Sequence, residues 1–167
     1  MRPAEEAETE QLAGIKSRYI RSLYRGFLAN DYLREASRDF YLPEITWMMR
    51  EKKLRVDVLE TDRQVVGYIA YGIDPSDPAC GIIREEAIQP EYGRREKDAL
   101  VQHAIRQLAD MGFSTIHLWV LRDNFRARYL FESIGFRPDG MARVEPRDGL
   151  QLNIARYAYQ VPGTAKP

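Results

Sequence analysis

The chain has 167 residues, and its 25 Lys and Arg residues balance its 25 Asp and Glu residues, which leaves a formal net charge of zero at pH 7. This length is typical of one compact domain, here residues 1–167, and a neutral chain has no overall field to attract nucleic acid or a membrane surface, so neither is expected as a partner. A single cysteine excludes an internal disulfide, and without a charged leader or an apolar run of about 18 residues we expect a soluble cytoplasmic protein.

The N-terminal part of the chain has the pattern of helices. Apolar side chains recur every three or four residues from Glu8 to Leu28, which is the spacing of an amphipathic helix that packs one face on a sheet. A second helical pattern runs from Asp31 to Met49. Pro43 lies inside it and is expected to break it, so two short helices are predicted there.

From Leu54 onward the apolar period changes to two, which indicates strands. Residues 54–58 and 65–73 are separated by Asp62-Arg63-Gln64 and predict an antiparallel hairpin. The loop that follows contains Cys80, while His103 and His117 are distant in sequence. We therefore expect neither a thiol catalyst nor a metal site.

The next predicted strand, Ile82 to Gln89, carries two adjacent glutamates, Glu85 and Glu86. Neighbouring residues of a strand face opposite sides, so one carboxylate should face the core or a cleft and the other the opposite face. A strand carboxylate at a cleft is a candidate general base. The alternative interpretation is an edge or surface charge.

The segment from Pro90 to Leu100 reads as a basic, glycine-containing loop between this strand and a helix. Unpaired N–H groups and the helix dipole at such a junction attract anions. These residues alone predict either a phosphate or pyrophosphate cradle for a nucleotide-type cofactor, or a solvated, charged turn that opens a surface helix.

The C-terminal half alternates strands and helices. A strand, a helix and a second strand in succession require a parallel pair, whereas the hairpins are antiparallel, so the fold class is α/β with a mixed sheet. Asp123-Asn124 supplies N-cap chemistry for the last helix. The predicted elements are a helix over Ala99–Met111, a strand over Ser114–Leu121, a helix up to Ile134 and Gly135, and strands over Met141–Pro146 and Leu150–Val161.

The run Leu118-Trp119-Val120-Leu121-Arg122-Asp123-Asn124 is followed by Arg126-Ala127-Arg128, Phe131-Glu132 and Ile134 to Gly140. In this order and spacing, these residues resemble the GNAT acyltransferase superfamily over nearly the whole chain, and Tyr24 to Leu28 with Arg156-Tyr157 are similar to one bacterial branch. The resemblance implies a mixed, mostly antiparallel sheet whose central parallel pair, residues 82–89 and 114–121, splays apart to hold the pantetheine arm of acetyl-CoA. It also implies an N-acetyltransferase that acts on an amine of a small molecule or peptide, and it leaves a homodimer open.

Site residues follow from the same resemblance. Glu85 or Glu86 would accept the proton of the attacking amine, directly or through water, and the Ile88 N–H would support the oxyanion. The residues implied for the co-substrate are Ile88, Gly93, Arg94, Arg95, Lys97, Asp98, Asn124 and Phe131. Those implied for the acceptor are Tyr24, Phe27, Tyr32 and Tyr157.

Two positions depart from the family pattern. Arg95 and Lys97 stand where glycines are usual, and a side chain there obstructs the phosphate and costs roughly 1–2 kcal/mol at positive φ. We expect co-substrate binding weakened by about one to two decades. Phe131 replaces the tyrosine that commonly protonates the leaving thiolate, so the alternative to an enzyme is an inactive binding or regulatory module of the same fold.

Overall fold

The structure is a computed structural model, and it describes residues 1–25, 36–147 and 150–163. The chain forms two compact units, residues 1–70 with 85–101 and residues 71–84 with 102–167. The elements in chain order are β1 (Arg2–Pro3), η1 (Glu6–Glu8), α1 (Thr9–Leu23), α3 (Arg38–Arg50), β2 (Leu54–Thr61), β3 (Gln64–Ile73), β4 (Gly81–Ile88), α4 (Arg94–Asp110), β5 (Thr115–Leu121), α5 (Phe125–Ile134), β6 (Arg137–Arg147) and β7 (Leu150–Gln160).

The seven strands form one sheet in the order β1-β2-β3-β4-β5-β7-β6. Parallel pairing joins Gly81, Ile82 and Ile83 of β4 to Ile116, His117 and Leu118 of β5. The pairs β1 with β2, β5 with β7 and β6 with β7 are antiparallel. The predicted mixed α/β fold with one parallel pair is therefore confirmed.

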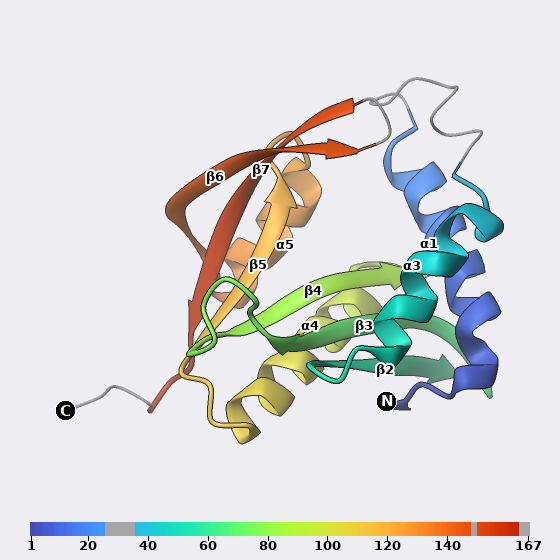
Figure 1. Cartoon of the computed structure of the whole chain (residues 1–167), viewed down its shortest axis with the longest axis horizontal. Helices are drawn as coiled ribbons and strands as arrows, with labels where there is room; N and C mark the ends of the chain where they lie inside the picture. The colour runs from blue at the N-terminus through green and yellow to red at the C-terminus, as the bar shows by residue number, and fades with distance from the viewer. Residues whose placement is uncertain (26–35, 148–149, 164–167) are drawn as a thin grey trace. The chain divides into compact units, whose positions relative to one another are not determined.

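In the first unit, α1 and α3 lie side by side (Figure 1). Ser37 caps α3, because its Oγ accepts the Phe40 N–H at 3.1 Å. Both helices bury one face in a core that they share with β2, β3 and β4. Its fully buried members include Leu12, Ile15, Ile45, Met48, Val58 and Tyr68.

The predicted helix break at Pro43 is wrong, because α3 runs through this residue from Arg38 to Arg50. Proline has no N–H, so the Asp39 carbonyl loses its usual partner four residues on. Asp39 and Pro43 are both exposed, and water can satisfy that carbonyl. The opposite face of the helix is buried at Ile45 and Met48, and this packing retains the helix.

The hairpin predicted around residues 62–64 is present. β2 and β3 are neighbours in the sheet and are joined by Asp62 and Arg63. Both turn residues have positive φ, 52° and 63°. Two left-handed residues match the twist of a two-residue hairpin, although such turns favour Asn and Gly over arginine.

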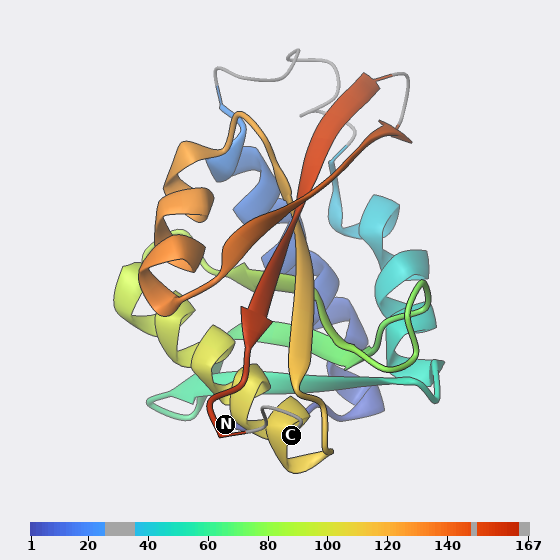
Figure 2. The ribbon, with the colours of Figure 1, turned by 90° about the vertical axis from the view of Figure 1, so that its left-hand side faces the viewer.

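In the second unit, β7 lies between β5 and β6, with α5 beside them (Figure 2). Asn124 caps α5 as predicted, since its Oδ1 accepts the Ala127 N–H at 3.1 Å. Gly135 ends this helix with φ of 122°, a conformation that favours glycine. The rings of Phe131, Phe136 and Tyr159 pack in succession, with centroids 6.0 and 5.3 Å apart.

Candidate active site

The two glutamates of β4 are met by polar side chains from the helices of the first unit. Lys16 of α1 donates to Glu85 Oε2 at 2.5 Å and to Glu44 Oε2 of α3 at 2.7 Å. The Tyr68 hydroxyl of β3 donates a short hydrogen bond to Glu85 Oε1. The Lys16 side chain is only 2% exposed, so these contacts hold a buried charge between two carboxylates.

Glu86 has a different partner. Lys97 Nζ lies 2.7 Å from Glu86 Oε1 and donates to the Tyr19 hydroxyl at 2.7 Å. Burial alone would lower the pKa of Lys97, but Glu86 and Tyr19 outweigh it, so the pKa is raised and Lys97 stays charged. Burial is also the largest cause of the raised pKa of Tyr19. We call Lys16, Tyr19, Glu44, Tyr68, Glu85, Glu86 and Lys97 the glutamate network.

The glutamate network joins carboxylates and ammonium groups from different elements. The carboxylates of Glu44, Glu85 and Glu86 face the ammonium groups of Lys16 and Lys97. Glu44 and Lys97 also have further interactions. The network therefore links α1, α3 and α4 to β3 and β4 through charged and polar side chains.

The two candidate bases differ in what their oxygens do. Both oxygens of Glu85 accept hydrogen bonds, from Tyr68 and from Lys16. Glu86 uses Oε1 for Lys97, while its Oε2 has no hydrogen-bond partner among the residues that the structure describes. The Glu86 side chain is 16% exposed, so water can reach it. Glu86 is therefore the carboxylate that can accept a proton without giving up an existing hydrogen bond.

The predicted loop from Gly93 to Asp98 is mostly helix, which corrects that expectation. α4 begins at Arg94, and the Lys97 N–H donates to the Gly93 carbonyl at 3.3 Å. Glu96 Oε2 accepts the Gly93 N–H at 3.0 Å, so an acidic side chain caps this helix start.

The backbone strain expected where glycines are usual is absent. Among the described residues, Asp62 and Arg63 are the non-glycine residues with positive φ, so Arg95 carries no such strain. Arg94 and Arg95 are exposed at the first turn of α4, and a Cβ added at Gly93 would meet no atom within 4 Å. Lys97 instead points to Glu86, although it was expected at the pyrophosphate, and Asp98 is half-buried in the same turn.

A model of the acetyltransferase (GNAT) family matches residues 18–136. The chain belongs to the GNAT family. No curated protein matches its sequence.

Solved GNAT structures share the fold over nearly the full length of both chains. The PaiA N-acetyltransferase of Thermoplasma acidophilum, in complex with coenzyme A, has 18% identity and a TM-score of 0.70, and covers 96% of this chain and 97% of that chain. A GCN5-related N-acetyltransferase of Rhodopseudomonas palustris has 16% identity and a TM-score of 0.77, with 96% and 94% covered. The ribosomal-protein-S18-alanine N-acetyltransferase of Escherichia coli has 18% identity and a TM-score of 0.69, with 99% and 96% covered.

The remaining residues that the GNAT resemblance assigned to the site lie in different settings. Ile88 is buried at the end of β4. Asn124 uses its side chain as the cap of α5, and Phe131 is buried at 3% exposure with its ring against Phe136. The Tyr157 hydroxyl donates to Glu132 and accepts from Arg128 of α5, at 2.8 and 2.9 Å, so it faces the helix.

Three residues expected at the acceptor remain, and the structure describes one of them. Tyr24 is half-buried just after α1. Phe27 and Tyr32 lie outside the described residues, so the structure gives no account of either expectation.

Sequence reasoning missed Lys16 and Glu44, which complete the glutamate network. Lys16 follows Leu12 by four residues and Ile15 by one, so it falls on the apolar stripe of α1. A lysine on a buried stripe requires an acidic partner, and this is the signal that points to it. Glu44 has no comparable signal, because a glutamate is ordinary on a partly exposed helix.

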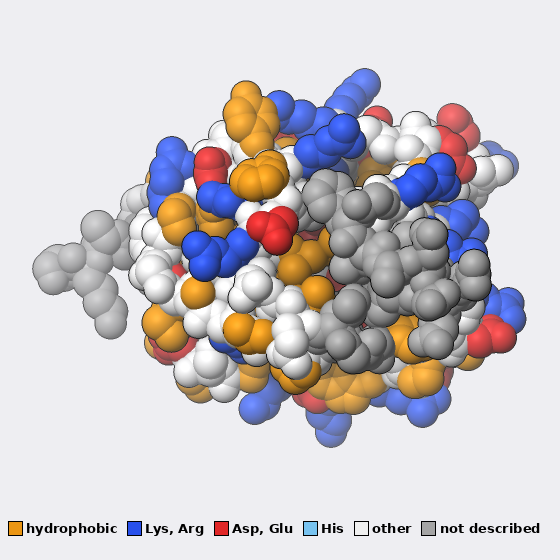
Figure 3. Space-filling view, turned by 90° about the horizontal axis from the view of Figure 1, so that it is seen from above, with side chains coloured by type: hydrophobic (Ala, Val, Ile, Leu, Met, Phe, Trp, Pro, Cys, Tyr) orange, Lys and Arg blue, Asp and Glu red, His pale blue; other side chains and the backbone are white. Residues whose placement is uncertain are grey.

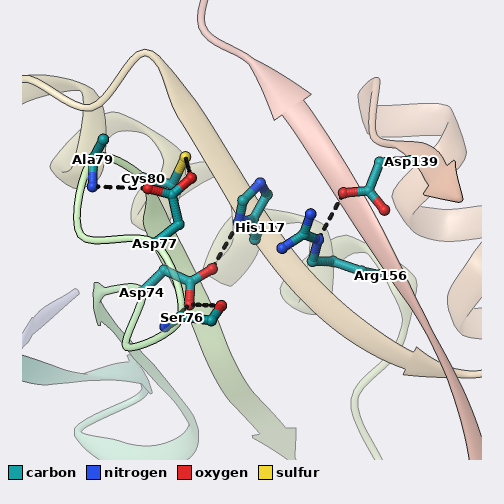
Figure 4. A network of polar contacts seen from close by, with 8 residues as sticks. All are labelled: Asp74, Ser76, Asp77, Ala79, Cys80, His117, Asp139 and Arg156. Carbon is teal, nitrogen blue, oxygen red and sulfur yellow. Dashed lines mark hydrogen bonds and ion pairs between the residues drawn. The ribbon is translucent and has the colours of Figure 1, made fainter. Parts of the chain in front are cut away.

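A second polar cluster of this GNAT protein lies in the second unit. Figure 4 shows Asp74 and Ser76 of the β3–β4 loop beside His117 of β5, and Asp139 beside Arg156 of β7. Asp74 Oδ2 lies 2.7 Å from His117 Nδ1, and its Oδ1 accepts from the Ser76 N–H and hydroxyl at 2.8 and 2.6 Å. Burial opposes these hydrogen bonds, but they prevail and lower the pKa of Asp74.

Cys80 lies in the same cluster and is poorly suited to nucleophilic chemistry. Its Sγ donates to Asp77 Oδ2 at 3.2 Å. Burial, followed by this carboxylate, raises its pKa to about 11, so the thiol stays protonated at neutral pH. Within the described ranges, no three His, Cys, Asp or Glu side chains are placed to hold a metal ion.

The surface shows no single charge field on the face drawn in Figure 3. Lys and Arg side chains stand among hydrophobic and acidic ones there. Among the helices that the structure describes, none combines the length and apolar character needed to cross a bilayer.

Proposed function

We propose that this GNAT protein transfers the acetyl group of acetyl-CoA to an amine of a small molecule or peptide, with Glu86 as the proton acceptor. The observation that carries the proposal is the glutamate network, in which Glu86 Oε2 is a carboxylate oxygen without a partner among the described residues. Family membership supports the acyl-transfer chemistry, and the coenzyme A bound to the Thermoplasma acidophilum relative supports the co-substrate.

The protein's own residues act at two points of this reaction. Glu86 removes a proton from the protonated acceptor, directly or through one water molecule. The amine nitrogen then forms a bond to the thioester carbonyl carbon, and the Ile88 N–H donates to the oxygen on which charge develops. The carbon–sulfur bond breaks, CoA leaves as a thiolate, and the nitrogen, positively charged after its attack, loses its second proton to water.

Phe131 cannot protonate the leaving group. A thiol of ordinary pKa, about 8.5, leaves tolerably as the thiolate, so the missing general acid lowers the rate and does not prevent the reaction. For the pyrophosphate, exposed Arg94 and Arg95 at the start of α4 remain candidate ligands together with the backbone of Gly93. Lys97 would act on Glu86 instead, as a positioning residue.

The test measures binding and turnover separately. Calorimetry with acetyl-CoA reports binding, and release of free thiol across a panel of amines reports turnover. Glu86→Gln should lower kcat about 10²–10⁴-fold while acetyl-CoA affinity changes little, because the carboxamide keeps the shape and loses the base. Glu91→Gln removes the same charge from an exposed neighbour and should leave kcat unchanged.

The alternative is an inactive binding or regulatory module. It is favoured by Glu96, which caps the helix start where the pyrophosphate is expected, and by Phe131. Acetyl-CoA binding without turnover across the panel would select this alternative. No binding at millimolar acetyl-CoA would overturn both versions of the proposal.

A further inference from the structure

The second unit contains a cavity that the proposed acyl transfer does not use. It lies where β5 gives way to α5, has a volume of about 320 Å³, and is lined by Arg122, Asp123, Phe125, Arg128 and Asn153. Ligand sites in proteins begin at about this volume. Two of the five lining side chains are arginines, and one is an exposed aromatic ring.

Arg128 is held in place at the cavity. Its Nε donates to the Tyr157 hydroxyl at 2.9 Å, and its Nη1 donates to the Arg122 carbonyl at 2.9 Å. Its guanidinium carbon lies 5.6 Å from the ring centre of Phe125. A guanidinium fixed by two hydrogen bonds and an aromatic face loses little freedom when it binds an anion through its remaining nitrogen.

Arg122 supplies a second cation without such restraints. Its backbone N–H donates to the Asn153 carbonyl at 2.9 Å, but its guanidinium has no hydrogen bond or ion pair to any residue in the described part of the chain. Among the five lining residues, Asp123 offsets one of the two arginine charges, and Glu132 also acts on the charge of Arg128 from outside the lining. Five N–H donors in a planar fork suit the oxygens of a carboxylate or phosphate.

Phe125 adds an apolar, flat surface to the cavity. The residue is 67% exposed, which is unusual for a phenylalanine, and it lies beside the fixed guanidinium of Arg128. A flat ring of a ligand can stack on this side chain while its acidic group reaches the arginines. An inorganic anion bound through charge alone would not need the exposed ring of Phe125.

We propose that this cavity is a binding site for a small aryl anion, an aromatic carboxylate or phosphate, whose acidic group lies between Arg122 and Arg128 and whose ring stacks on Phe125. None of its five lining residues has a role in the proposed acyl transfer, and the proposal does not depend on that function. Asn153 contributes a side-chain amide as a further hydrogen-bond partner.

The experiment uses the full chain and four probes: phenyl phosphate, benzoate, the neutral benzamide and inorganic phosphate. Phenyl phosphate or benzoate should bind saturably at low-millimolar concentration or better, with amide NMR shifts centred on Phe125 and Asn153. Benzamide should bind at least tenfold more weakly. The ratio of phenyl phosphate to benzoate affinity then identifies whether a phosphate or a carboxylate is preferred.

Three variants distinguish binding at this cavity from non-specific attraction of anions to the protein surface. Arg122→Gln should weaken the aryl anions at least tenfold, and Phe125→Leu should weaken them while inorganic phosphate binding is unchanged. Arg106→Gln removes the same charge from an exposed position of α4 and should have no effect. Arg122 makes no described side-chain contact, so its variant is expected to fold, which its circular dichroism spectrum checks.

The proposal is overturned if binding of every probe fails to saturate at concentrations about ten times above the low-millimolar range. It is also overturned if Arg122→Gln and Arg106→Gln weaken binding equally. A further overturning result is the loss of phenyl phosphate binding when desulfo-CoA saturates the protein, because the cavity would then belong to the co-substrate site. Retained binding under saturating desulfo-CoA is the expected result.

Discussion

Lys16 shows most directly how one side chain organises the candidate active site. Its buried ammonium group joins α1 to α3 through Glu44 and to β4 through Glu85. Taking an ammonium group out of water is costly, and the two carboxylates, together with the Tyr41 ring centred 4.9 Å from the Lys16 nitrogen, offset that cost. The pairing also engages Glu85, so that Glu86 is the carboxylate with an oxygen that has no partner among the described residues.

Replacing Lys16 by methionine should therefore destabilise the fold. Lys16→Met leaves the Glu85 carboxylate, 18% exposed, without its cation, and we expect a loss of about 3 kcal/mol in the free energy of unfolding. Urea denaturation at neutral pH measures it. The double variant Lys16→Met/Glu85→Gln should recover part of the loss, whereas a single-variant loss below about 1 kcal/mol would contradict this account.

The lowered pKa of Asp74 leads us to expect that the stability of the fold depends on pH. Its pKa in the folded state is lowered, so its contribution is full above the unfolded value of about 3.9 and disappears as the pH falls through the lower folded value. We expect Asp74→Asn to be less stable than the natural protein at neutral pH, by a margin that shrinks below about pH 4. Chemical denaturation across this range measures the margin, and the exposed Asp110→Asn should show a small margin at every pH.

The β2–β3 hairpin carries local strain at the scale of the element. Arg63 adopts φ of 63°, which costs a residue with a Cβ roughly 1–2 kcal/mol, while glycine adopts it freely. Arg63→Gly should raise the free energy of unfolding by about 0.5–1 kcal/mol after the added freedom of the unfolded chain is subtracted. Thermal or urea unfolding measures the change, and an unchanged or lower stability would show that the turn relaxes at Arg63.

An arginine-to-glycine substitution at an extended position of β2 is the control for Arg63→Gly, and its expected effect on stability has the opposite sign. Arg55 is exposed within β2. Arg55→Gly should lower the stability by roughly 0.5–1 kcal/mol, because glycine weakens a strand interior. Opposite signs at residues 63 and 55 would attribute the effect to backbone conformation and not to loss of an arginine.

Local sequence signals predicted some elements well. Asn124 and Gly135 were placed at the two ends of α5 because capping chemistry acts over a few neighbouring residues. Pro43 and the residues after Gly93 were misjudged for the opposite reason. The packing of α3 on α1 and the pairing of Lys97 with Glu86 involve residues far apart in the chain, and no local rule contains them.

At the scale of the whole molecule, the sequence predicted the family and the mixed sheet, because motif order and alternation of elements survive at low identity. The candidate site was harder to predict. Glu85 and Glu86 were found as a pair, but the choice between them depends on hydrogen bonds from α1, β3 and α4 that only coordinates reveal. Phe131, assigned to the co-substrate from the resemblance, is buried among aromatic rings in this structure.

The contrast between buried and exposed ion pairs has a consequence for ionic strength. Dissolved electrolyte screens charges on the surface within about 10 Å at 0.1 M, but it acts far less on charges that water cannot surround. The attraction within exposed pairs such as Arg38 with Glu10, whose side chains are 53% and 69% exposed, will weaken as the salt concentration rises. The links of Lys16 with Glu85 and of Lys97 with Glu86, whose side chains are at most 18% exposed, will persist, so the arrangement around the proposed base changes little with ionic strength.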